Sequence, residues 1–147
     1  MPDVKSPSLR RLFQDWEQRR RGRAFPTRSD FDPLDLKYIL GDLSLIDVLH
    51  DPQRFRMRLH ATNVVDRGGI DLTGKFIEDM PDERRRSNMI RHWQQVVADR
   101  RPSVVRFNNE YSDQRRWNCE ILLLPLSSDG TTVDMLMAAF AWSEPGG

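Results

Sequence analysis

Residues 43–61, LSLIDVLHDPQRFRMRLHA, decide the fold class of this chain. Two runs rich in strand-forming residues, 43–49 and 54–61, flank a turn with the sequence HDPQ, a pattern that is typical of a β-hairpin. In the second run apolar and basic side chains alternate: the apolar ones are Phe55, Met57 and Leu59, and the basic ones are Arg54, Arg56 and Arg58. This period of two predicts a strand with one apolar and one basic face.

The segment after the hairpin predicts a long helix and three more strands. In residues 80–102, Pro81, Asp82 and Glu83 suit the positive end of a helix dipole. An apolar stripe follows at helical spacing, formed by Met89, Ile90, Trp93, Val96 and Val97. Strands are predicted at 103–111, 115–126 and 132–142, with turns at 112–114 and 127–130. We expect these three strands to form an antiparallel meander.

An amphipathic helix is predicted in front of the hairpin. Ser6 and Pro7 suit its start, it ends near Gly22, and its apolar stripe consists of Leu9, Leu12, Phe13 and Trp16. Such a stripe is too apolar to face water, so it must pack either on its own sheet or on the same helix of a second chain. From the second alternative we predict a homodimer with these four residues in its interface.

The order of elements predicts an α+β fold: a five-stranded antiparallel sheet with helices on one face and an extra N-terminal helix. We divide the chain into the N-terminal helix (1–24), a linker rich in helix breakers with a short helical stretch (25–42), and the core (43–143). A length of 147 residues fits one such domain.

Composition indicates a cellular compartment for the protein but does not indicate its binding partners. The 23 basic and 22 acidic residues almost cancel, so the net charge does not point to nucleic acid or to a membrane surface. The single cysteine, Cys119, fits a reducing compartment, and no apolar run is long enough to cross a bilayer. We therefore expect a cytoplasmic protein.

Four short segments carry a resemblance to a known family. They are RRGRAFPTRSDFDP (20–33), LGDLSLIDV (40–48), RFRMRLHAT (54–62) and GIDLTGKFIEDM (69–80). Together with the order of strand pair, helical middle and three-strand finish, they resemble the PAS domain, in a bacterial branch where this domain is nearly the whole protein. Ala61 stands where that family usually has Gly.

The resemblance implies a sensory or regulatory domain whose sheet and covering helices enclose a cavity for a small ligand, with the N-terminal helix used for dimerisation. Ten apolar side chains are the expected lining: Leu45, Met57, Leu59, Met89, Trp93, Phe107, Ile121, Leu123, Met135 and Met137. The alternative is that the same side chains simply fill the core.

The stretch GGIDLTGKF, residues 68–76, looks like a phosphate-binding loop but lacks its chemistry. Phe76 stands where such a loop needs Ser or Thr to reach magnesium, and Asp71 would repel phosphate. We interpret Gly68, Gly69 and Gly74 as residues that release the backbone into positive φ at loop joints, and Asp71 or Thr73 as the cap of a local turn.

Other cofactors and catalytic groups find no support in the sequence. His50, His60 and His92 have no metal-ligand spacing. His60 is expected to face solvent, His92 does not by itself mark a haem site, and Cys119 on a strand does not match the helical cysteine of flavin photoreceptors. We predict no metal, haem, flavin or nucleotide, and no enzyme.

The function predicted from the sequence is a non-catalytic sensory protein that acts in signal transduction through contacts with a signalling partner, with a small ligand as the gate. Two alternatives stay open: a small-molecule-binding or catalytic α+β domain, and weak nucleic-acid binding through arginine-rich surfaces. Asp and Glu residues lie among those arginines, which argues for ordinary solvated faces.

Overall fold

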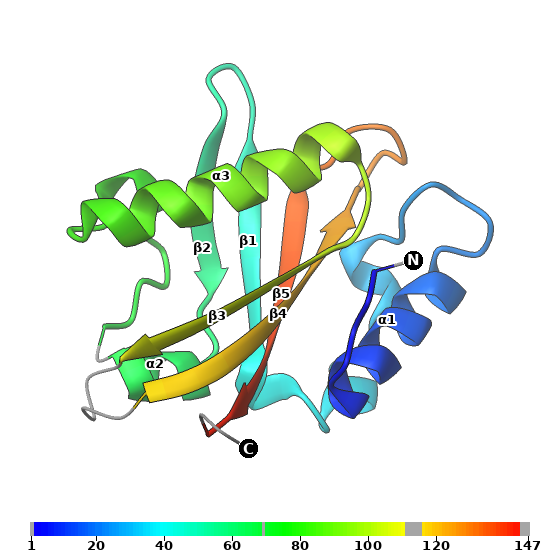
Figure 1. The fold of residues 1–147 in the computed structure, drawn as a ribbon. Coiled ribbons are helices and arrows are strands. Elements are labelled where there is room, and N and C mark those ends of the chain that lie inside the picture. The colour runs from blue at the N-terminus through cyan, green and yellow to red at the C-terminus, as the bar shows by residue number, and fades with distance from the viewer. Residues whose placement is uncertain (1, 69, 111–115, 145–147) are drawn as a thin grey trace.

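The structure is a computed structural model that describes residues 2–68, 70–110 and 116–144 (Figure 1). Its centre is a five-stranded antiparallel sheet with the strand order β2-β1-β5-β4-β3. The strands are β1 (Leu43–Leu49), β2 (Arg54–Leu59), β3 (Ser103–Glu110), β4 (Arg116–Leu126) and β5 (Met135–Ser143). The predicted hairpin and meander are confirmed, whereas the predicted turn at 112–114 lies outside the described residues.

Three α-helices accompany the sheet: α1 (Pro7–Arg19), α2 (Thr62–Gly68) and α3 (Glu83–Asp99). The linker forms short 3-10 turns, η1 (Arg28–Asp30), η2 (Pro33–Leu36) and η3 (Leu40–Asp42), and a fourth turn, η4 (Ile77–Asp79), precedes α3. The predicted α+β class is therefore confirmed. None of the helices in the described ranges is long and apolar enough to cross a membrane.

The pairing of β1 with β5 joins the hairpin to the meander. Leu43 pairs with Ala139, and Ser44 pairs with Ala138, which in turn lies beside Leu123 of β4. Because side chains alternate along a strand, these pairs define two faces of the sheet. We call the face with Ser44, Ala138 and Leu123 the α3 face, and the opposite face, with Leu43, Ala139 and Leu122, the α1 face.

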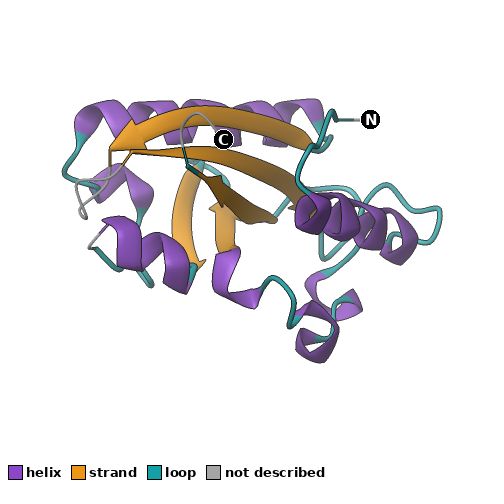
Figure 2. Cartoon of the chain, turned by 60° about the horizontal axis from the view of Figure 1, so that its bottom comes forward, coloured by secondary structure: helices purple, strands orange, loops and turns teal. Residues whose placement is uncertain are grey.

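α1 packs on the α1 face of its own sheet, away from α2 (Figures 1 and 2). The indole Nε1–H of Trp16 donates to the carbonyl of Pro125 at 2.9 Å. The start of the helix is fixed as well, because the Glu120 carboxylate accepts from the backbone N–H of Ser6 at 2.8 Å and of Lys5 at 3.1 Å. All four residues of the apolar stripe are buried: Leu9, Leu12, Phe13 and Trp16.

This burial corrects the predicted dimer interface. Leu9, Leu12, Phe13 and Trp16 are at most 7% exposed within a single chain, so they offer no free apolar surface to a second copy. The sequence left two partners for the stripe, and the structure selects the sheet, which offers Leu122 and Leu124 on the same face. The homodimer itself stays a prediction, but the apolar stripe of α1 no longer supports it.

α3 begins and ends where its sequence predicts. The Asp82 carboxylate accepts from the backbone N–H of Arg85 at 3.1 Å, which satisfies one of the free donors of the first turn. The helix stops at Arg100, whose φ of 58° is left-handed. Trp93 is buried and meets Phe55 edge to face at 5.5 Å between ring centroids, which holds the helix over β2.

The packing of α1 makes Trp16 a strong contributor to stability. We expect Trp16→Ala to lower the free energy of unfolding by about 3–5 kcal/mol, since it removes a buried ring and leaves the Pro125 carbonyl without its donor. Urea unfolding followed by far-UV circular dichroism measures this change. Gln14→Ala, on the exposed side of the same helix, is the control and should stay within about 0.5 kcal/mol of the native protein. A loss below about 1 kcal/mol for Trp16→Ala would show that α1 does not pack on the sheet.

Candidate functional site

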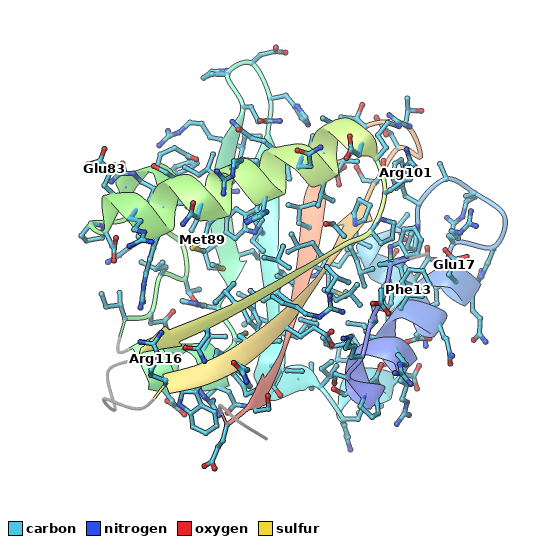
Figure 3. All side chains as sticks on the ribbon, viewed as in Figure 1. Phe13, Glu17, Glu83, Met89, Arg101 and Arg116 are labelled. Carbon is cyan, nitrogen blue, oxygen red and sulfur yellow. The ribbon has the colours of Figure 1, made fainter. Side chains whose placement is uncertain are left out.

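A cavity of ≈ 970 Å³ lies between the α3 face of the sheet and the segments that cover it, which include α2 and α3. Figure 3 shows Met89 at the edge of α3 that borders this region and Arg116 at the start of β4. Its interior is mainly apolar. Six of the ten predicted lining residues lie in its wall: Met57, Met89, Trp93, Phe107, Ile121 and Leu123.

Three of the other predicted lining residues lie on the wrong face. Leu45 pairs with Met137, and Met135 lies two residues further along β5, so all three belong to the α1 face. The prediction was wrong because β1 and β5 are central strands that are buried on both faces. Their apolar residues do not alternate with polar ones, and the sequence therefore gives no sign of which residues face the helices.

The fourth misplaced residue, Leu59, is displaced by a β-bulge. Ile46 pairs with Met57 but Leu45 pairs with Leu59, so β2 carries one extra residue at this point. Leu59 consequently lies on the α1 side and is 42% exposed. The same irregularity brings His60 into the cavity wall, where the sequence predicted a solvent-facing side chain.

His60 is the main polar group of the inner wall. Its side chain is only 8% exposed, and its Nδ1 accepts a hydrogen bond from the backbone N–H of Leu72 at 3.1 Å. Burial lowers the pKa of His60 and outweighs the opposite effect of Asp71, which is 4.0 Å away. The imidazole is therefore neutral at pH 7, and since Nδ1 is an acceptor, the proton is on Nε2.

Ser44 supplies a second hydrogen to the cavity. It lies in the floor with 1% exposure, and its Oγ accepts from the backbone N–H of Ala61 at 2.9 Å. Within the described residues, neither the Ser44 hydroxyl hydrogen nor His60 Nε2–H has an acceptor. A ligand with an acceptor atom can pair with these donors.

Arginines and amides form the rim. Arg84, Asn88 and Arg91 line the cavity from α3, and their spacing of i, i+4 and i+7 places them on one side of the helix. Across from them Arg116 donates through Nε to Oδ1 of Asn108 at 2.7 Å. Sequence reasoning missed this set, although the spacing on α3 was a usable signal, because it treated the arginines as a solvated face.

His92, also on α3, lines the cavity and is partly buried. Its pKa is lowered by burial and by the neighbouring Arg91. Cys119 is buried, and burial raises the pKa of its thiol to about 12, so it is protonated and unreactive at neutral pH. Among the described residues no group of three His, Cys, Asp or Glu side chains is placed to hold a metal.

Residues 74–76 contribute to the sheet edge beside β2. The N–H of Gly74 donates to the carbonyl of Met57 at 2.6 Å, and the Met57 N–H donates to Lys75 O at 2.9 Å. Gly74 has a φ of 82°, which agrees with its interpretation as a backbone joint. For Gly68 the interpretation was wrong, because this residue ends α2 without a positive φ, and Gly69 lies outside the described residues. Asp71 accepts from Thr73 N at 2.9 Å, which confirms the local cap.

α2 is tied to the end of the cavity by a small polar network. Oδ1 of Asp42 accepts both from Nδ2 of Asn63 at 2.8 Å and from Nε1 of Trp142 at 3.2 Å. The guanidinium of Arg67 lies 4.3 Å from the ring centroid of Trp142. Gly41 permits this approach, because a Cβ there would lie 2.9 Å from Asn63 Nδ2.

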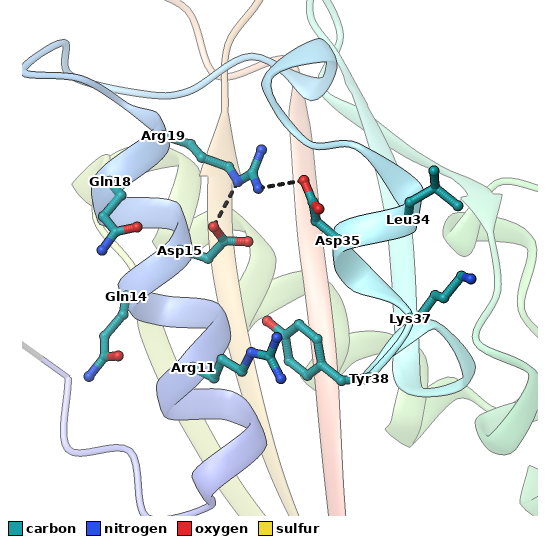
Figure 4. A pocket seen from close by; sticks show the side chains of 9 residues that line it. All are labelled: Arg11, Gln14, Asp15, Gln18, Arg19, Leu34, Asp35, Lys37 and Tyr38. Atoms are coloured by element: carbon teal, nitrogen blue, oxygen red, sulfur yellow. Dashed lines mark hydrogen bonds and ion pairs between the residues drawn. The ribbon is translucent and has the colours of Figure 1, made fainter.

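A second hollow, of ≈ 580 Å³, lies between α1 and residues 34–38 (Figure 4). Three of its charged groups are engaged with one another. Arg19 bonds Asp15 at 2.7 Å and Asp35 at 3.0 Å. The guanidinium of Arg11 lies 3.9 Å from the ring centroid of Tyr38. We interpret this hollow as the joint that tethers the linker to α1.

The arginine-rich strand surface is also largely neutralised. Arg56 and Arg58 bond the buried Asp47 at 3.2 Å and 2.9 Å, and Arg54 lies 3.6 Å from Glu78. These contacts leave little free positive charge for the phosphates of a nucleic acid. This strand surface thus gives the nucleic-acid alternative no support.

Comparison with known proteins identifies the family of this chain. The sequence profile of the PAS domain matches residues 4–140, almost the full length of the chain. The chain belongs to the PAS domain family. This PAS domain is also similar to a chain in a solved structure of a fungal LOV domain photoreceptor, with 13% identity and a TM-score of 0.47. The match covers 78% of this PAS domain and 93% of that chain. Among curated proteins no relative matches.

Two neighbouring alanines distinguish a real cavity from a filled core. Ala138 lies in the cavity floor, whereas Ala139 lies on the packed α1 face, and both are at most 2% exposed. We expect Ala138→Phe to change the free energy of unfolding by less than about 1 kcal/mol, because the ring enters open space. Ala139→Phe should lose about 1–3 kcal/mol or more through overpacking. Urea unfolding of both variants measures the difference, and equal losses would mean that the α3 face is packed as well.

The buried neutral His60 gives the PAS domain an acid sensitivity. Its pKa in the folded state is below the usual 6.5, so the unfolded chain binds more protons as the pH falls below that value, and stability decreases. We expect the melting temperature to fall between pH 7 and pH 5, and to fall less in His60→Gln, which keeps an acceptor for Leu72 N–H. The range from pH 7 to pH 5 lies above the usual pKa values of Asp and Glu side chains.

His50→Gln is the matched control for this titration. His50 is exposed and bonds the Val133 carbonyl at 2.9 Å, so His50→Gln shows what the same substitution does at a histidine outside the cavity wall. His92 has a lowered pKa too, and the residual slope in His60→Gln is assigned to it. An unchanged slope in His60→Gln would be incompatible with a buried neutral imidazole.

Proposed function

We propose that this PAS domain is a non-catalytic sensor that passes a signal through contact with another protein, and that a small ligand in the cavity controls that contact. The observation that carries the proposal is the ≈ 970 Å³ cavity with Ser44 and His60 in its wall. Ser44 and His60 are held by backbone N–H groups at 2.9 Å and 3.1 Å, which fixes their orientation before a ligand arrives. Such preorganisation favours binding over simple space filling.

A route from the cavity to the surface supports the signalling part of the proposal. Trp142 lines the cavity and donates to Asp42, which also holds Asn63 of α2. Asp42 ends η3, and the segment 33–42 is joined to α1 by the Arg19–Asp35 ion pair. A ligand that moves Trp142 therefore acts on α2 and on the linker together, and these become the elements whose position a partner senses.

The surface at this segment suits a protein contact. Leu34 and Leu40 are exposed by 67% and 39%, unlike most apolar side chains of the chain. A partner protein that covers them gains apolar burial when the segment takes the right position. The homodimer, the cytoplasmic location and the bacterial origin are further parts of this proposal that rest on the sequence.

Native mass spectrometry of freshly purified protein tests the ligand. We expect a species with extra mass that is lost on denaturation, and its absence in Ala138→Phe, where the added ring occupies the floor of the cavity. Ala138→Ser, which scarcely changes the volume, should retain the mass. The same extra mass bound by Ala138→Phe would place the ligand outside the cavity and contradict the proposal.

Hydrogen exchange tests the signalling route. On addition of the released ligand we expect altered amide protection in α2 and in residues 33–42, as well as in the cavity wall. The hairpin turn at 50–53 should not change and serves as the internal control. Protection confined to the cavity wall, with α2 and 33–42 unaltered, would rule out this route.

A further inference from the structure

We propose that the ligand of this cavity is an amphipathic organic anion, with its apolar body between α3 and the sheet and its anionic group at the rim beside Arg84, Arg91 and Arg116. This inference rests on the proposed ligand-binding function and adds the chemical class of the ligand. It is drawn from the charges around the rim, the donors in the inner wall and the apolar surface between them.

The rim on α3 is a row of donors. Arg84 and Arg91 are seven residues apart, close to two full turns, so both line the cavity from the same side of the helix. Asn88 lies between them, and its Oδ1 accepts from Arg91 at 3.3 Å. In the described part of the chain, neither arginine has a carboxylate partner. Guanidinium groups arranged in this way bind carboxylates, sulfonates or phosphates through paired N–H donors.

The acidic residues near the cavity do not neutralise this row. Asp82 is the one carboxylate in the described wall, and it is engaged at 3.1 Å with Arg85 N and at 3.7 Å with the Arg85 guanidinium. Arg106 also lines the cavity, but its guanidinium bonds Glu120 at 2.8 Å on the α1 face. Arg84, Arg91 and Arg116 are thus left without an acidic partner among the described residues, and an anionic ligand supplies one.

The inner wall is unfavourable for a cationic ligand. Ser44 and His60 each present a hydrogen to the cavity, so a cationic ligand would meet donors inside and guanidiniums at the rim. The surface between these polar groups is apolar and suits a hydrocarbon or aromatic body. It is formed by Met57, Met89, Trp93, Phe107, Ile121 and Phe140. Only a molecule with both an apolar body and an anionic group uses the whole cavity.

Two fluorescent probes with the same body separate charge from apolar burial. 1-Anilinonaphthalene-8-sulfonate carries a sulfonate, and N-phenyl-1-naphthylamine is the same aromatic amine without it. We expect the double variant Arg84→Gln/Arg91→Gln to lower the affinity for the sulfonate probe roughly tenfold, which is the usual scale for charge-assisted hydrogen bonds. The affinity for the neutral probe should fall by less than about twofold. Raising the salt concentration from about 50 to 500 mM should lower the affinity for the sulfonate probe only.

A matched variant controls for net charge. Arg28→Gln/Arg101→Gln removes two exposed arginines that do not line the cavity, and it should leave the affinity for both probes as in the native protein. Ala138→Phe shows where the probes bind, because it should weaken both of them about equally. Thermal melts of every variant confirm that each one is folded.

The outcomes distinguish this inference from the function on which it rests. If the rim variant weakens the sulfonate probe alone, the anionic class is supported. If both probes bind in the cavity and the rim variant changes neither, or both equally, the preference for an anion is overturned while the ligand-binding function stands. If neither probe binds, or if Ala138→Phe leaves both unaffected, the ligand site itself is overturned together with the anionic class.

Discussion

The backbone ladder between β1 and β5 holds together two parts of the chain that are far apart in sequence, with Leu43 opposite Ala139. It places two apolar strands in the centre of the sheet, where both faces are withdrawn from water. Each face then requires a cover, because an exposed apolar sheet face is unstable in water. The chain supplies α1 for one face and α2 with α3 for the other, and the rest of the structure follows from this division.

The two covers differ in how closely they pack. α1 lies directly on its face, with Leu9 and Leu12 fully buried and Trp16 hydrogen-bonded to the backbone of β4. α3 buries only Trp93 and Val96 among its described residues, and the ≈ 970 Å³ cavity remains beneath it. The α1 face therefore contributes the stability that a dense core provides, and this stability allows the α3 face to keep open space.

The cavity owes its chemistry to backbone geometry more than to unusual residues. A single extra residue in β2 directs His60 inward, and the Leu72 N–H fixes its proton on Nε2. Bulges commonly redirect a side chain in this way at the border of a functional site. The rim arises differently, from the helical repeat of α3, which brings Arg84 and Arg91 to the same side. The cavity has hydrogen-bond donors in its interior and positive charge at its rim. Its two ends therefore differ chemically, unlike those of a purely apolar core.

Much of the local structure could be predicted from the sequence. The alternation in 54–59, the apolar stripe of 89–97 with Asp82 as its cap, and the buried stripe of α1 each report a period that depends only on neighbours in the chain. The same holds for Gly74, whose role follows from its left-handed backbone. Of the six expected residues that lie in the cavity wall, Met57, Met89 and Trp93 come from elements with one clear apolar face. Ile121 and Leu123 come from β4, which is buried on both faces, so the sequence did not determine their side.

The orientation of several side chains and the packing partner of α1 could not be predicted from the sequence, because both depend on the tertiary fold. Leu45, Met135 and Met137 lie on strands that are buried on both faces, so only pairing with neighbouring strands decides which way each side chain points. Leu59 and His60 exchange sides through a bulge that has no sequence mark. The apolar stripe of α1 predicted burial but not its partner, because burial depends on surfaces brought together from distant segments. The sequence by itself determined the elements and their apolar faces, and tertiary pairing decided which faces meet and where space is left between them, since these are properties of long-range contacts.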